Sequence, residues 1–352
     1  MPYIVGAGVA KLPYTIKQTD IKPFIKEMFS DVFADLERLL TVFENTDIDQ
    51  RNFCVPMEWF REPHNFKEKN HLYIQQAVKL GKEALTNCLA NANLTINDIT
   101  HLFFISTSGL STPSIDARIM NELMDSPLVQ VKRTPIWGLG CAGGAGGIAR
   151  AMDYCLAYPK EIVAVISVEL CGLTFQPNDL SKSNLVATSL FADGAAAVLV
   201  AGDQAKASGS LKMVHSQSIL WNNTLDVMGW DISSSGFHVI FSKDIPTFVQ
   251  NQVAQTLQKF LQEHDRSSPD HFILHPGGKK VLEAYQKALN IPIDKLNLAR
   301  KVLRENGNMS SSTVLYVLNE FLQNEVANKG EIGLITALGP GFSSEMLLVE
   351  GV

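Results

Sequence analysis

Three short glycine-rich motifs each carry one side chain that could do chemistry. They are Gly-Cys-Ala-Gly-Gly at 140–144, His-Pro-Gly-Gly at 275–278 and Gly-Asn-Met-Ser at 307–310. A cysteine can act as a nucleophile, a histidine as its proton partner, and an asparagine as an uncharged donor to a developing oxyanion. Each motif alone is weak evidence, but the three together favour an enzyme of nucleophilic acyl transfer.

Cys141 lies just before an expected helix, from about Ala145 to Leu156. The positive end of that helix and its unpaired N–H groups would favour the thiolate, and the N–H of Cys141 could help hold an oxyanion. The small residues at 142–147 require that an acyl group or a neighbouring helix comes close to this backbone. A buried cysteine in a glycine-rich packing turn fits the same residues equally well.

His275 ends an expected strand, and Asn308 occupies the turn that corresponds to Cys141 in the second half of the chain. The histidine could pair with a Cys141 thiolate and donate to a carbonyl oxygen, or it could be a structural histidine. The asparagine could donate to an enolate without adding charge. A turn asparagine in the left-handed conformation is the alternative.

The composition fits a compact enzyme: 352 residues, 46% hydrophobic, 19% charged, with a net charge of −6. This charge argues against a nucleic-acid or anionic-membrane surface, and the longest apolar runs, such as Ala195–Ala201, are too short to span a bilayer. We expect no signal peptide. The five cysteines have no C-x-x-C pair, so we expect no disulfide framework, no metal site and a cytoplasmic location.

The two halves of the chain repeat one order of elements. An apolar run begins at His101, 40 residues before Cys141, and another begins at His271, 37 residues before Asn308. This repetition predicts an α/β fold of two pseudo-symmetric halves with buried sheets and helices on their faces. The small, polar stretch 202–210 divides them. Residues 1–205 would carry the cysteine, and residues 206–352 the histidine and asparagine.

The N-terminal region from Ile21 to about Cys88 should be mostly helical. Four apolar residues recur there at every fourth position and predict one buried stripe: Phe24, Met28, Val32 and Leu36. The stretch 59–69 is rich in proline, histidine, asparagine and charge, and we expect it to be a surface loop.

The chain resembles the type III polyketide synthases, the chalcone-synthase-like branch of the thiolase fold, over nearly its whole length. Six segments carry the resemblance: 107–109, 137–144, 190–196, 275–278, 307–311 and 339–341. The resemblance implies a thiolase-like fold in αβαβα layers. It also implies a homodimer that uses acyl-CoA and malonyl-CoA and needs no cofactor.

The resemblance also implies roles for the three motif residues. Cys141 would take the starter acyl group, while His275 and Asn308 would orient malonyl-CoA, assist its decarboxylation and stabilise the enolate. One of the family's two gatekeeper phenylalanines corresponds to Phe191. The other is replaced by Val239, which would enlarge the site. Gly339, Pro340 and Gly341 would shape the backbone around the cavity.

Further substrate-binding positions follow from the same resemblance. They are Thr107, Cys171, Gly172, Thr174, Gly277, Gly278 and Ser310, with Arg38 and Lys280 for the CoA phosphates. A small thiol at Cys171 beside Gly172 is similar to bacterial members with a tunnel for a long acyl chain, although simple core packing explains Cys171 equally well. We therefore expect a fatty-acyl starter and alkylpyrone products.

Two other functions fit parts of the pattern. A ketoacyl-acyl carrier protein synthase III shares the fold and a Cys-His-Asn set, but Gln-Ala-Asn should then follow the histidine, where this chain has Pro276-Gly277-Gly278. A catalytically silent thiolase-like partner protein would not need the intact set of three.

Overall fold

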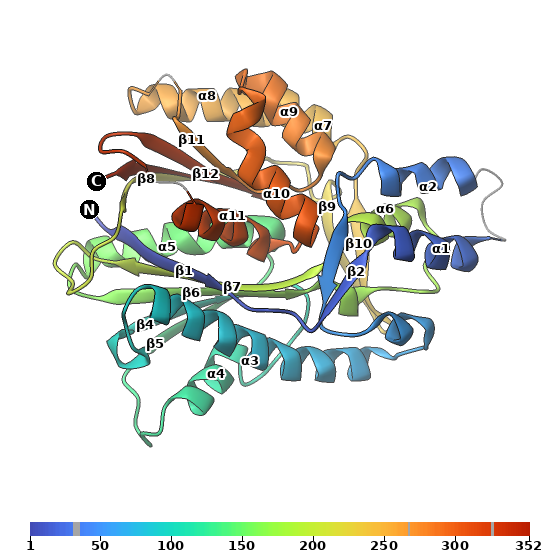
Figure 1. Cartoon of the computed structure of the whole chain (residues 1–352), viewed down its shortest axis with the longest axis horizontal. Helices are drawn as coiled ribbons and strands as arrows, with labels where there is room; N and C mark the ends of the chain where they lie inside the picture. The colour runs from blue at the N-terminus through green and yellow to red at the C-terminus, as the bar shows by residue number, and fades with distance from the viewer. Residues whose placement is uncertain (31–35, 267, 325–326) are drawn as a thin grey trace.

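The computed structural model describes residues 1–30, 36–266, 268–324 and 327–352. Its strands and helices form five layers (Figure 1). On one outer side lie α3 (Phe66–Asn91) and α4 (Ile115–Leu123), and on the other lie α7 (Ile245–Phe248), α8 (Ala254–Glu263) and α9 (Lys279–Leu289). Between two layers of strands lie α5 (Gly143–Ala157) and α11 (Ser311–Asn324). The predicted αβαβα arrangement is therefore confirmed.

The strands of the two layers share one topology. The first layer has the order β5-β4-β6-β7-β1 and the second β11-β12-β13-β8, and only two residue pairs between β1 and β8 join them. Two parallel pairs are followed by two antiparallel pairs in the first layer, and one parallel pair is followed by two antiparallel pairs in the second. The strands are β1 (Tyr3–Val9), β4 (His101–Ile105), β5 (Lys132–Ile136), β6 (Ile162–Leu170), β7 (Asp193–Ala201), β8 (Leu211–Leu220), β11 (His271–Leu274), β12 (Ile332–Gly339) and β13 (Ser343–Gly351).

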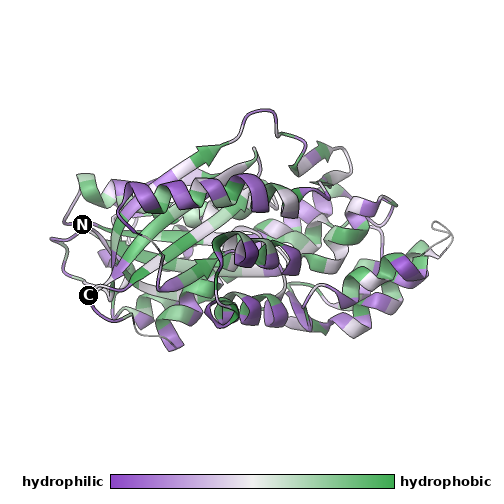
Figure 2. Cartoon of the chain, turned by 90° about the horizontal axis from the view of Figure 1, so that it is seen from above, coloured by the Kyte–Doolittle hydropathy of each residue, from purple (hydrophilic) through white to green (hydrophobic). Residues whose placement is uncertain are grey.

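The core lies where the central helices meet the strands. Every residue of β6, β7 and β12 is buried, in keeping with their β-branched and alanine-rich sequences. Helix α11 packs closely against the small residues at 142–147. If Gly144 carried a Cβ atom, it would lie only 2.2 Å from the carbonyl oxygen of Ser311 on α11. Figure 2 shows the hydrophobic strands inside and hydrophilic surfaces on the outer helices.

A smaller group of elements lies beside one end of the layers, on the right in Figure 1. It consists of β2 (Tyr14–Lys17), α1 (Gln18–Phe29), α2 (Leu36–Glu44), β3 (Gln50–Phe53), α6 (Lys182–Leu190), and a hairpin of β9 (Met228–Ser233) and β10 (Gly236–Phe241). On the predicted apolar stripe, Phe24 and Leu36 are buried. Val32 lies outside the described residues.

The predicted surface loop at 59–69 is wrong in part. A short 3-10 helix covers Met57–Arg61, and α3 already begins at Phe66. Asn65 and Glu68 form a reciprocal capping box at its first turn, so polar residues that suggested a loop instead begin a helix. Among the described residues, no helix is both long enough and apolar enough to cross a membrane.

Candidate active site

Cys141 lies in a 3-10 turn, Gly140–Ala142, that leads directly into α5. The backbone at Gly140 is left-handed, with φ of +48°, and a Cβ there would lie 2.5 Å from Cδ of Pro340. A Cβ at Gly339 would lie 2.3 Å from the carbonyl oxygen of Leu139. The segment Gly339–Gly341 therefore packs against the turn that carries the cysteine, and its glycines act through their backbone.

Asn308 lies in the turn between α10 (Asn297–Asn306) and α11, as its place in the repeat predicts. Its N–H donates to the carbonyl of Leu190 and its carbonyl accepts from the N–H of Ala192, both at 2.9 Å. Its side-chain amide donates to the carbonyl of Gly277 at 3.0 Å, and its Oδ1 accepts from the N–H of Ser310 at 2.9 Å. Asn308 thus connects the strand that follows α6 with the turn that follows His275.

Contacts join all three motifs. Cys141 Sγ lies 3.5 Å from the hydroxyl oxygen of Ser310, whose backbone is held by Asn308. The Asn308 amide holds Gly277, and a Cβ at Gly277 would lie 3.6 Å from Nε2 of His275. A continuous set of neighbours therefore runs from the cysteine through the asparagine to the turn that follows His275, where the N–H of Gly277 donates to the carbonyl of His275 at 3.1 Å.

Burial keeps the cysteine and the histidine uncharged in this conformation. It raises the pKa of the Cys141 thiol to about 12, although the hydrogen bond to Ser310 lowers it, and it reduces the pKa of His275 to about 4. The Nδ1 atom of the histidine is buried without a hydrogen-bond partner among the described residues. Burial of the sulfur therefore acts against the thiolate that the helix end is expected to favour.

Two cavities adjoin this group of residues. Gly140, Cys141, Ser310 and Pro340 contribute to the smaller one. The larger one has Cys171, Gly172 and Thr174 in its wall, in a mainly apolar lining that includes Ile21, Phe24, Ile25, Phe53 and Phe60. Phe191, Trp230 and Val239 belong to both cavities. The two chambers therefore meet at these three side chains.

Trp230 is a residue that sequence reasoning missed. It lies directly opposite Val239 in the β9–β10 register, so both side chains share one face of the hairpin. Its ring lies 6.0 Å from that of Phe191, centroid to centroid. The enlargement expected from Val239 is therefore offset by the indole of its neighbour. No motif surrounds Trp230, and only the pairing of the two strands identifies it.

Arg51, on β3, is a second residue that the sequence did not reveal. Its guanidinium is buried in the wall of the larger cavity, donating from Nη1 to the carbonyl of Phe191 at 2.7 Å and from Nε to Gln18 at 3.0 Å. Burial lowers its pKa to about 9, while the charge of Asp193 acts in the opposite direction. Asp193 accepts from the N–H groups of Cys54 and Gly172, and burial raises its pKa to about 6.

Other predicted binding residues lie elsewhere. Arg38 on α2 and Lys280 on α9 are exposed and line neither cavity. Thr107 also lines neither, since its N–H and its hydroxyl both donate to the buried carboxylate of Glu169 at 3.0 Å. Burial raises the pKa of that carboxyl group. Gly277 and Gly278 border the His275 turn rather than the chambers.

Comparisons with known proteins agree with this geometry. The family models of the chalcone and stilbene synthases match residues 18–204 with their N-terminal domain and residues 212–352 with their C-terminal domain. A Bacillus subtilis (strain 168) protein, whose name carries a provisional chalcone synthase assignment, is 48% identical over 99% of this chain and 98% of its own. The 1,3,6,8-tetrahydroxynaphthalene synthase of Streptomyces peucetius subsp. caesius is 35% identical over 99% and 92%.

Among solved structures, the 1,3,6,8-tetrahydroxynaphthalene synthase of Streptomyces coelicolor A3(2), described as a bacterial type III polyketide synthase, superposes with a TM-score of 0.93. It is 29% identical, and 99% of each chain is covered. The chain belongs to the chalcone and stilbene synthase family. It is a type III polyketide synthase, an acyltransferase that joins an acyl group from acyl-CoA to malonyl-CoA by decarboxylative condensation. The ketoacyl-acyl carrier protein synthase III hypothesis is therefore set aside, as is that of a silent partner.

Proposed function

We propose that Cys141 is the acylated nucleophile of this synthase. The neutral His275 ring would accept the thiol proton as Sγ attacks the thioester carbonyl of the starter, and the proton would then pass to the departing CoA thiolate. Such a transfer suits two groups that are both uncharged beforehand. The observation that carries the proposal is the unbroken set of contacts from Cys141 through Ser310 and Asn308 to the His275 turn.

Asn308 and His275 would act together in the decarboxylation. The Asn308 amide has two hydrogens, and the carbonyl of Gly277 takes one of them. The second can donate to the thioester oxygen of malonyl-CoA, which becomes an enolate oxygen when carbon dioxide leaves. The enolate carbon then attacks the acyl group on Cys141, forming the new carbon–carbon bond and returning the cysteine thiolate.

Two variants test these roles. Cys141→Ala should fold but take up no label from a radioactive acyl-CoA, and label on another cysteine would contradict the assignment. Asn308→Ala should still load starter, while carbon dioxide release from malonyl-CoA falls by about 10²–10³, the usual cost of losing one oxyanion donor. An unchanged release rate would remove Asn308 from the mechanism.

We further propose a long-chain fatty-acyl starter and alkylpyrone products. The apolar larger chamber behind Phe191 and Trp230, with Cys171 and Gly172 in its wall, supports this proposal. Each CH₂ group buried there would gain about 0.8 kcal/mol. Product analysis with malonyl-CoA and acyl-CoA starters of increasing length, with an aromatic starter alongside, tests it. Preference for the aromatic starter would be contrary evidence.

We also infer that the enzyme works as a homodimer in the cytoplasm. Apolar side chains are exposed beside the Cys141 motif, with Trp137 48% and Leu110 41% accessible, and a second copy of the chain could cover them. All five cysteines are buried and unbridged, which suits a reducing compartment. Light scattering of the purified protein tests the dimer, and a monomer at working concentration would contradict it.

A further inference from the structure

The β9–β10 hairpin forms part of the cavity wall without belonging to the central strand layers. Its two strands pair only with each other among the described residues. Trp230, Phe237 and Val239 on this hairpin all line the larger cavity. A second part of the wall consists of Thr174 and Phe175, a few residues after the buried end of β6. Whatever fastens the hairpin to this second part therefore determines their relative position.

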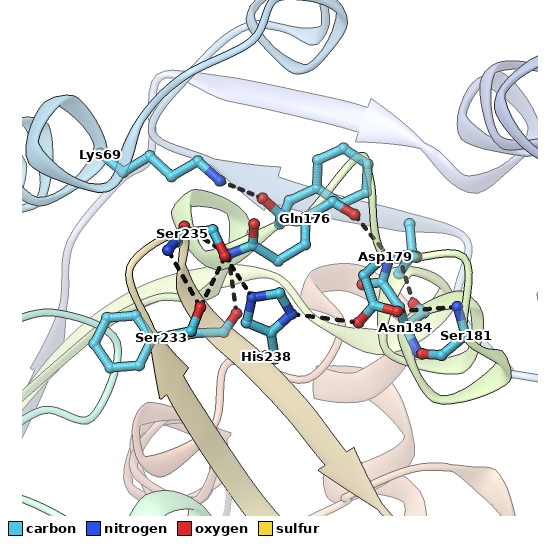
Figure 3. A network of polar contacts seen from close by, with 11 residues as sticks. Lys69, Gln176, Asp179, Ser181, Asn184, Ser233, Ser235 and His238 are labelled. Carbon is cyan, nitrogen blue, oxygen red and sulfur yellow. Dashed lines mark hydrogen bonds and ion pairs between the residues drawn. The ribbon is translucent and has the colours of Figure 1, made fainter.

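One fastening is a buried amide. The side chain of Gln176, 6% exposed, donates from Nε2 to two hairpin carbonyls, that of Ser235 at 3.2 Å and that of Phe237 at 3.1 Å. The backbone carbonyl of Gln176 accepts from Nδ2 of Asn184 at 2.9 Å, and Asn184 itself lines the larger cavity. Figure 3 shows this amide between the hairpin and the loop before α6.

A second fastening lies on the other face of the hairpin. The ring of His238 lies between the hydroxyl of Ser235, 2.7 Å from Nε2, and the carboxylate of Asp179, 3.7 Å from Nδ1 (Figure 3). This contact is partly exposed to water, so it holds the hairpin less firmly than the buried amide does. Asp179 belongs to the same loop as Gln176. Both fastenings therefore connect the hairpin to one segment, 176–184.

We propose that Gln176 is a positioning residue that determines starter specificity, because it fixes the position of Trp230 and Val239 relative to Thr174 and Phe175 in the cavity wall. The proposal rests on the proposed function of the larger chamber as the starter site. Without the Gln176 amide, the carbonyls of Ser235 and Phe237 both lose this donor. The loss matters most at Phe237, because that residue is buried and a buried carbonyl without a donor destabilises the structure. The hairpin then moves outward to reach water, and the passage beside Phe191 widens.

Two substitutions test this proposal. Gln176→Ala removes the amide, and Gln176→Glu keeps its shape but replaces the donor with an acceptor. Gln258→Ala is the matched control, since Gln258 is an exposed residue of α8 whose amide donates to the carbonyl of Ala288, outside both cavities. The measurements are kcat/KM for straight-chain and branched or aromatic acyl-CoA starters, and the rate of carbon dioxide release from malonyl-CoA without a starter.

We expect the ratio of kcat/KM between the best and the bulkiest starter to fall about tenfold in both Gln176 variants, as the loss of a buried hydrogen bond predicts. Carbon dioxide release should stay at the wild-type rate, because Asn308 does not contact the hairpin fastening, and Gln258→Ala should match wild type throughout. Ratios within twofold of wild type would overturn the proposal. So would an equal fall in carbon dioxide release, or a wild-type enzyme that does not discriminate between starters.

These outcomes are distinct from a failure of the larger chamber as the starter site, which would appear as equal use of long starters by Cys171→Phe and by wild type. If Gln176→Ala is insoluble, Ser235→Gly and His238→Asn loosen the same hairpin from its exposed side. In those two variants, the ratio of kcat/KM between the best and the bulkiest starter should also fall, but by less than in the Gln176 variants. A wild-type ratio in both would then count against the proposal.

Discussion

Because the His275 ring is uncharged in the folded protein, we predict that the free energy of unfolding decreases as the pH falls. Burial lowers the pKa of this ring from 6.5 to about 4. Between these two pH values the ring is neutral in the folded protein but protonated in the unfolded chain. The resulting contribution to stability is fully present above pH 6.5 and is lost as the pH falls toward 4. Between pH 7 and pH 5, the loss from this one group amounts to about 2 kcal/mol.

The replacement His275→Gln removes the titrating group and keeps a side chain of similar size. Urea unfolding of wild type and variant at pH 7, 6 and 5 gives the free energy of unfolding of each, and subtracting one from the other cancels every other titration. The wild type should lose about 2 kcal/mol more than the variant between pH 7 and pH 5. Equal losses would refute the reasoning, because they would mean that the folded ring takes up its proton as readily as the unfolded chain does.

Two further predictions concern the larger cavity. Cys171→Phe should prevent the use of long starters but not of short ones, because the phenyl ring would fill space that a long acyl chain needs in a closely packed tunnel. Equal use of long starters by the variant and by wild type would contradict this. Arg51→Met should lower the free energy of unfolding in urea by about 1–3 kcal/mol, because the carbonyl of Phe191 loses its donor. It should also slow carbon dioxide release from malonyl-CoA, because the backbone on either side of Phe191 holds Asn308. Arg51→Lys should restore part of the stability and part of the carbon dioxide release. If Arg51→Met released carbon dioxide as fast as wild type, Arg51 would have no influence on Asn308.

The fold could be predicted from the sequence because its two halves repeat one another. Apolar runs at His101 and His271, each followed at a similar distance by a glycine-rich turn, correspond to β4 and β11 in matching positions of the two layers. Polar composition was a poorer guide. The residues 59–69 resembled a loop because helix capping uses the same asparagine and glutamate side chains as turns do.

Much of the candidate site could also be predicted, because chemistry requires particular residue types in tight turns. Cys141, His275 and Asn308 are such residues, and the structure brings their turns together. The high pKa of Cys141 and the low pKa of His275 come from burial, which depends on the whole fold and which the local motif does not reveal. Arg38 and Lys280 are exposed and line neither cavity, and their contact with the CoA phosphates stays a prediction.

The segment from Leu190 to Ala192 explains why the starter chamber and the decarboxylation site should depend on each other. The N–H of Asn308 donates to the carbonyl of Leu190, and its carbonyl accepts from the N–H of Ala192. Phe191 lies between these two residues. Its carbonyl accepts a hydrogen bond from Arg51, and its ring lies beside that of Trp230. A starter that displaces the Phe191 ring therefore acts on the same short stretch of backbone that holds the Asn308 amide. Phe191 and Arg51 can thus influence both the acyl group that is accepted and the rate at which malonyl-CoA is decarboxylated.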